Sequence, residues 1–73
     1  MTATAPRSLL ECILDAASRS VRPAFTLFAH GADGFTLLSR STSAVEIADA
    51  YVIAALNGRD GLEIRCDGVR VQL

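Results

Sequence analysis

The 73-residue sequence lacks lysine and tryptophan, has one histidine and two cysteines, and contains no long apolar run. Its longest apolar stretch, Ala50 to Leu56, is far shorter than the roughly 20 residues that span a bilayer. Residues 1–7 are small and polar, without the basic start and apolar segment of a secretory signal. We therefore expect a cytoplasmic protein with no membrane partner.

The scarcity of histidine and cysteine limits the chemistry that the chain can perform. Cys12 and Cys66 lie in opposite halves with no Cys-x-x-Cys motif, whereas zinc needs about four nitrogen or sulfur ligands. We predict two reduced, buried thiols and no metal or other cofactor. His30 and Asp33 could form a base and its orienting group, but a catalytic site also needs further groups that converge in a pocket. We expect His30 to be a turn residue and the chain not to be an enzyme.

The composition of the chain favours self-association. Half of the residues are hydrophobic (51%), which excludes a disordered chain. The net charge of −1 excludes a strongly basic nucleic-acid binder. A domain of this length has a marginal core, so surplus apolar surface predicts a homodimer or a tight partner complex. All seven basic residues are arginine, a bias that indicates a G+C-rich bacterial or phage genome.

The first predicted element is a helix over residues 8–20. Ser8 and Glu11 have the Ser-x-x-Glu spacing of a capping box. Pro23 disfavours a helical conformation for the residue before it, so the helix should end near Ser20. Apolar side chains between these limits recur at helical spacing: Leu9, Leu10, Ile13, Leu14 and Ala17.

A second helix is predicted after Ser43, which forms a capping box with Glu46, and before the helix stop at Asn57-Gly58. The alternative for residues 50–56 is a buried strand. The cap, the length and the alanine content favour the helix. Apolar residues surround nearly all of its last two turns, and one sheet face cannot bury them alone.

Between the helices, residues 25–29 and 35–39 flank five turn-forming residues and predict a hairpin with a loop over 30–34. In that register one face of the hairpin carries Phe25, Leu27, Phe35 and Leu37. Phe28 and Leu38 then lie on the opposite face, where a partner is expected to cover them.

The last hairpin turns at Asp67-Gly68, a sequence that supplies two residues with positive φ between alternating strands. The two-residue turn predicts one apolar face with the pairs Cys66–Val69, Ile64–Val71 and Leu62–Leu73. On the other face Arg65 stands opposite Arg70, with Glu63 diagonal to Arg70. This face is either an internally neutralised, solvated surface or a small cationic patch.

The two halves therefore share one pattern of helix followed by hairpin. We predict an α+β fold in α-β-β-α-β-β order, with a four-stranded antiparallel sheet and two helices mainly on one face. The whole chain is predicted to be a single small domain, with residues 1–7 as a disordered tail.

Two segments resemble known families over less than half of the chain. Ser20-Val21-Arg22-Pro23-Ala24 is similar to the His-Ala-Arg-Pro-Ala signature of HPr phosphocarriers, with serine where their phosphorylated histidine belongs. Residues 44–73 resemble the helix-Gly-strand-turn-strand start of Phd/YefM antitoxins, which bind operator DNA as dimers. Neither resemblance is taken as family membership.

These observations predict a non-catalytic protein-interaction or regulatory module, of the kind represented by phage-type inhibitors of bacterial proteins. The alternative is a dimeric, antitoxin-like DNA-binding regulator that uses Arg59, Arg65 and Arg70. The candidate binding residues are Arg59, Arg65, Arg70, Phe28, Leu38 and Tyr51. A candidate anion-binding or phosphorylation site, at the start of the second helix, comprises Arg40, Ser41, Thr42 and Ser43.

Overall fold

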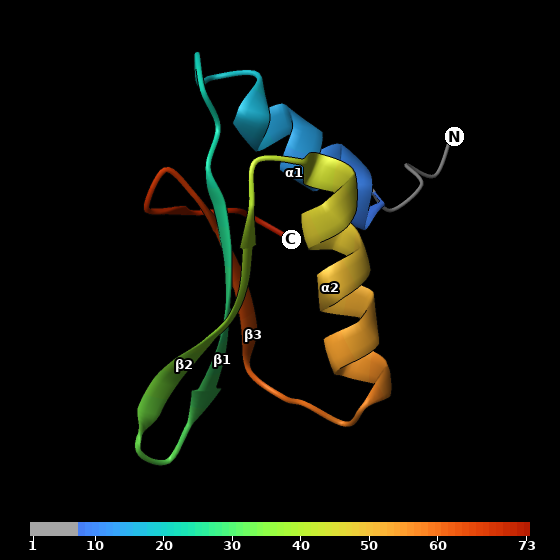
Figure 1. Cartoon of the computed structure of the whole chain (residues 1–73), viewed down its shortest axis with the longest axis vertical. Coiled ribbons are helices and arrows are strands. Elements are labelled where there is room, and N and C mark those ends of the chain that lie inside the picture. Colours follow the sequence, from blue (N-terminus) through green and yellow to red (C-terminus); the bar gives the residue numbers. More distant parts are fainter. Residues whose placement is uncertain (1–7) are drawn as a thin grey trace, which may run out of the picture.

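The computed structural model describes residues 8–73, which form two helices and one four-stranded antiparallel sheet (Figure 1). The elements, in chain order, are α1 (Leu9–Ala17), β1 (Phe25–Gly31), β2 (Gly34–Ser41), α2 (Ala44–Leu56), β3 (Leu62–Cys66) and β4 (Val69–Arg70). The strand order in the sheet is β2-β1-β3-β4. The predicted fold class and element order are confirmed. The predicted tail over residues 1–7 lies outside the described residues.

Both helices begin at the predicted caps. The Ser8 hydroxyl accepts a hydrogen bond from the Glu11 amide (3.1 Å), and the Ser43 hydroxyl accepts one from the Glu46 amide (3.3 Å). These bonds satisfy amides that have no partner inside the helix. Residues 50–56 are helical, as the cap and the alanine content indicate. The first helix ends at Ala17, earlier than predicted, and the chain continues through a turn.

The core lies between the helices and one face of the sheet, because both helices pack on the same side (Figure 1). Its largest fully buried side chains come from every layer: Ile13 of α1, Ile47 of α2, Phe25 and Leu27 of β1, and Ile64 of β3. The central strand β1 contributes alternate residues to this core, as a strand with one buried face does.

The first hairpin differs from the prediction in its register. The turn is formed by two residues, Ala32 and Asp33, so that His30 pairs with Phe35 and Phe28 with Leu37. A shift of one residue exchanges the two faces of a strand. The prediction that Phe35 and Leu37 belong to the core face is therefore wrong: both lie on the face opposite the helices, with Phe28.

The first hairpin also contains a β-bulge in β2. Leu27 pairs with Ser39 but Phe28 pairs with Leu37, so Leu38 is an extra residue in β2. Leu38 is partly buried and packs against the core cluster. The prediction that Leu38 shares the outer face with Phe28 is wrong: Leu38 alternates with the outward Leu37 and lies toward the helices, and the bulge places Ser39 on the same side.

The second hairpin turns as predicted, with φ angles of 53° at Asp67 and 82° at Gly68. Arg65 pairs with Arg70, and the Val71 amide donates to the Ile64 carbonyl (2.8 Å). The regular strand ends at Arg70, so the ladder between β3 and β4 does not extend to the predicted Leu62–Leu73 pair. Of the six predicted inward residues, Val69 and Leu73 remain exposed: Val69 lies in the edge strand β4, and Leu73 lies beyond the end of that strand.

The turn of this hairpin also holds the segment that joins α1 to β1. The Asp67 carboxylate accepts hydrogen bonds from the Ala24 amide (3.0 Å) and from the Ser20 hydroxyl. The Asp67 amide in turn donates to the Ala24 carbonyl (2.9 Å). The bonds to the carboxylate hold the pKa of Asp67 below its ordinary value, the Ser20 hydroxyl contributing most.

Gly61, in the loop that enters β3, combines a positive φ (64°) with close packing against His30. A β-carbon at this position would lie 2.9 Å from the His30 carbonyl oxygen. We expect Gly61→Ala to lower the free energy of unfolding by about 2–3 kcal/mol, as measured by urea denaturation.

Gly58→Ala is the matched control, because Gly58 also has a positive φ (82°) but open space around its missing β-carbon. This variant should lose only the conformational part, about 1 kcal/mol. Equal losses in the two variants would show that the contact with His30 has no influence on stability.

Candidate interaction surface

The sheet face opposite the helices carries aromatic, apolar and cationic side chains together. Strand pairing places Phe28 beside Leu37 and Glu63, and it places Arg65 beside Arg70. We call this surface the outer sheet face and define it by Phe28, Phe35, Leu37, Arg40, Arg65 and Arg70. Figure 1 shows both helices on the other side of the sheet. Within residues 8–73, this face is therefore left uncovered.

Glu63 is the electrostatic centre of the outer sheet face. Its side chain is 8% exposed, and one carboxylate oxygen, Oε2, accepts a hydrogen bond from Nε of Arg65. The other, Oε1, lies 3.2 Å from Nε2 of His30 and 3.7 Å from Nε of Arg70. The hydrogen bond from Arg65 lowers the pKa of Glu63 despite the opposing effect of burial, and His30 adds to the lowering.

This carboxylate explains how two arginines can stand opposite each other on neighbouring strands. Like charges in such a pair destabilise a sheet unless a counter-charge lies close by. Glu63 supplies that charge to both Arg65 and Arg70. The Arg70 side chain is nevertheless 70% exposed. One carboxylate cannot accept hydrogen bonds from all the N–H groups of two guanidinium groups, so some of these donors face solvent.

Arg65 is also held by two aromatic rings. Its Cζ atom lies 5.1 Å from the ring centroid of Phe28 and 5.5 Å from that of Phe35. The two rings meet edge to face, with centroids 5.0 Å apart. Hydrogen bonding to Glu63 and cation–π contact with both rings fix the guanidinium before any partner binds.

The described charges are separated between the two sides of the molecule. The helices contain Glu11, Asp15, Glu46 and Asp49 and no basic residue. Arg19 follows α1 and pairs with Asp15 at 3.1 Å. The outer sheet face, in contrast, holds Arg40, Arg65 and Arg70 against the single carboxylate of Glu63. A net charge near zero thus conceals an acidic helical layer and a cationic sheet face.

Three of the predicted binding residues lie elsewhere. Leu38 and Tyr51 are partly buried against the core. Arg59 follows α2 and lines a groove with Leu27 and Ile53, on the helical side of the sheet. Arg59 therefore does not continue the surface formed by Arg65 and Arg70.

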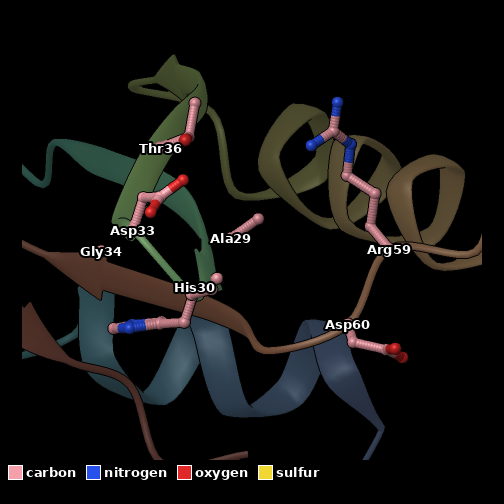
Figure 2. A pocket seen from close by; sticks show the side chains of 9 residues that line it. Ala29, His30, Asp33, Gly34, Thr36, Arg59 and Asp60 are labelled. Carbon is pink, nitrogen blue, oxygen red and sulfur yellow. The ribbon is translucent and has the colours of Figure 1, made fainter.

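His30 and Asp33 line a second pocket, of about 320 Å³, together with Arg59 and Asp60 (Figure 2). Figure 2 shows the His30 ring turned away from Arg59 and Asp60, and its Nε2 atom interacts with Glu63 instead of Asp33. The Ser20 hydroxyl donates a hydrogen bond to the Asp67 carboxylate. The described contacts therefore do not join His30, Asp33 and a nucleophile.

The serines at the start of α2 take part in local capping. The Ser41 hydroxyl donates to the Glu46 carboxylate (2.6 Å) and accepts from the Ser43 amide (3.0 Å). Arg40 pairs with Thr26 and belongs to the outer sheet face. Thr42 is exposed between the two serines. These contacts give the hydroxyl groups of both serines a structural role, and the anion site stays a prediction.

Both cysteines are buried and form no disulfide, and burial raises the pKa of the Cys66 thiol. Among residues 8–73, no three His, Cys, Asp or Glu side chains are grouped in a way that would hold a metal ion. Over the same residues, neither helix is long and apolar enough to cross a membrane.

Comparisons with protein-family models, curated proteins and solved structures found no match. The function is therefore inferred from the residues of the outer sheet face. Sequence reasoning found Phe28, Arg65 and Arg70 but missed Phe35 and Leu37, because the expected turn was three residues too long. The sequence signal for the role of Glu63 as a counter-charge was its position diagonal to Arg70 in the predicted hairpin.

The lowered pKa of Glu63 gives a pH-dependent prediction. A carboxyl whose pKa is lower in the folded state stabilises the fold above its ordinary pKa of 4.5, and this contribution disappears as the pH falls through the folded value. We expect Glu63→Gln to lower the free energy of unfolding at neutral pH by about 1–3 kcal/mol. The difference from the natural chain should shrink below pH 4.5.

Urea denaturation over a pH series measures this difference, with Asp60→Asn as the matched control at an exposed loop carboxylate. The control should change stability by less than about 0.5 kcal/mol. A loss in Glu63→Gln that stays constant with pH would contradict the electrostatic role of Glu63.

Proposed function

We propose that this chain is a cytoplasmic, non-catalytic protein-binding module that regulates a partner by covering an acidic and apolar surface on it. The outer sheet face is the proposed recognition surface. The single observation that carries the proposal is the Arg65 guanidinium held between Glu63 and the rings of Phe28 and Phe35. A phage-type inhibitor of a bacterial protein is one example of such a regulator.

The residue types on this face support a protein partner. Arginine and aromatic side chains are enriched among residues that dominate binding energy. The exposed fractions of Phe35 (54%) and Leu37 (48%) leave apolar surface beside the cation. Because Arg65 is already fixed, binding loses less side-chain entropy than it would with a free arginine.

The charge of the face defines the chemistry of the partner. Arg65 and Arg70 share one carboxylate, and Arg40 extends the positive charge along β2. Guanidinium groups bind carboxylates through paired N–H donors. A segment that presents apolar side chains beside Asp or Glu therefore fits this surface better than a basic segment.

A second candidate function is the binding of single-stranded nucleic acid, because Phe28 and Phe35 lie among arginines on a sheet face that residues 8–73 leave uncovered. Such platforms stack bases on aromatic rings and bind phosphates with basic side chains. This candidate differs from the DNA-binding alternative of the sequence analysis, since Arg59 lies on the helical side of the sheet.

Amide chemical shifts of the ¹⁵N-labelled protein test the proposal with two probes: a Leu/Glu amphipathic helical peptide and a single-stranded oligothymidylate of about 12 nucleotides. We expect the peptide to shift amides of β1, β2 and β3 around Phe35 and Arg65. Phe35→Ala and Arg65→Gln should each weaken peptide binding about tenfold, since both residues belong to the centre of the face.

Val21→Ala and Arg22→Gln are the matched controls, because both residues are exposed in the segment between α1 and β1. They should leave the peptide affinity unchanged. Tighter binding of the oligonucleotide, weakening steeply with salt, would replace the protein-binding function with the nucleic-acid candidate. No shifts with either probe would contradict the assignment of this face as a recognition surface.

A further inference from the structure

The helix α2 presents a second apolar surface, on the side that faces away from the sheet. Val45, Asp49, Val52 and Leu56 follow one another at the i, i+4, i+7, i+11 spacing of a helical stripe. We call these four residues the α2 outer stripe. The apolar members are 47–82% exposed, whereas Ile47 and Ala54, on the opposite side of the helix, are buried.

A helix that is apolar on opposite sides is typically covered on both. Within residues 8–73, α2 packs against α1 and the sheet, and the α2 outer stripe remains exposed. Its only charged member is Asp49. The stripe therefore has the chemistry that the outer sheet face is proposed to recognise: apolar side chains around a carboxylate.

The two surfaces also match in length. The 13 residues of α2 extend about 20 Å along the helix axis, and the seven residues of β1 extend about 23 Å. Helices already cover the other face of the same sheet (Figure 1). A helix on the outer sheet face would complete three layers in an α/β/α arrangement, in which both sheet faces are covered.

Charge decides between the possible pairings of two copies. Two outer sheet faces would bring Arg65 and Arg70 of each copy together, with only the buried Glu63 carboxylates to offset them. Two α2 outer stripes would bring the Asp49 carboxylates into one interface. A stripe against a sheet face places carboxylate near guanidinium instead, so this pairing avoids both repulsions.

We infer that a second copy of this chain docks its α2 outer stripe on the outer sheet face. This inference rests on the proposed function and names one partner for that surface. The interface is head-to-tail, so a bound pair still offers one free stripe, on one copy, and one free sheet face, on the other. Copies therefore add in a chain or close into a ring, beyond the homodimer expected from composition.

Sedimentation velocity with two single-face variants tests this geometry. Val52→Glu adds charge to the stripe, and Phe35→Glu adds it to the sheet face. The natural chain should exceed the mass of a dimer as its concentration rises from about 10 µM to about 1 mM. Each variant alone should be monomeric, and an equimolar mixture should form a dimer through the one intact stripe and the one intact sheet face.

Val21→Glu, at a 99% exposed position outside both surfaces, should associate like the natural chain. Leu56→Glu, at an 82% exposed position of α2, provides a second stripe variant. Circular dichroism confirms that each variant is folded. A monomeric natural chain, or a dimer-limited chain whose mixed variants stay monomeric, would overturn the head-to-tail inference.

The peptide titration separates this inference from the proposed function. A natural chain that stays monomeric yet binds the Leu/Glu peptide through Phe35 and Arg65 keeps the protein-binding function and loses only the second copy as partner. A chain that neither associates nor binds the peptide loses both.

Discussion

The carboxylate of Glu63 allows two arginines, Arg65 and Arg70, to face each other on one sheet. It lies among His30, Arg65 and Arg70 and is almost completely buried. A buried carboxylate is destabilising unless hydrogen-bonded cations surround it. Here the same contacts stabilise the charge of Glu63 and offset the repulsion between two facing arginines. They also orient Arg65 over the rings of Phe28 and Phe35.

The number of helices sets the second constraint. In the part of the chain that the structure describes, two short helices cover one face of a four-stranded sheet and leave the other face exposed. The core is consequently shallow, with few large side chains fully buried. Apolar surface remains on both sides of the molecule, on the outer sheet face and on the α2 outer stripe. Surfaces of this kind are typical of proteins that complete their packing in a complex.

The distribution of charge is more informative than its sum. A net charge of −1 argues against strong attraction to nucleic acid by the whole molecule. The structure separates acidic helices from a cationic sheet face, so local attraction for a carboxylate-bearing partner persists at a net charge near zero. This separation supports both the proposed acidic partner and the head-to-tail contact between copies.

The sequence by itself determined the elements that rest on local contacts. The caps at Ser8 and Ser43 join residues three apart, and the Asp67-Gly68 turn requires two adjacent positive φ angles. Each of these interactions is complete within a few residues, so its spacing is visible in the sequence. The facing pair of Arg65 and Arg70 followed directly from that turn.

Only the tertiary structure decided which face Phe35, Leu37 and Leu38 occupy. An Asp-Gly sequence is present here too, at Asp33-Gly34, but the two turn residues are Ala32 and Asp33, one position earlier, and the bulge at Leu38 shifts the register again. Burial of Glu63, separation of Arg59 from the other arginines, and attachment of Ala24 to Asp67 likewise join residues distant in the chain. Strand register and packing against the helices determine such contacts together, and neither can be read from local spacing alone.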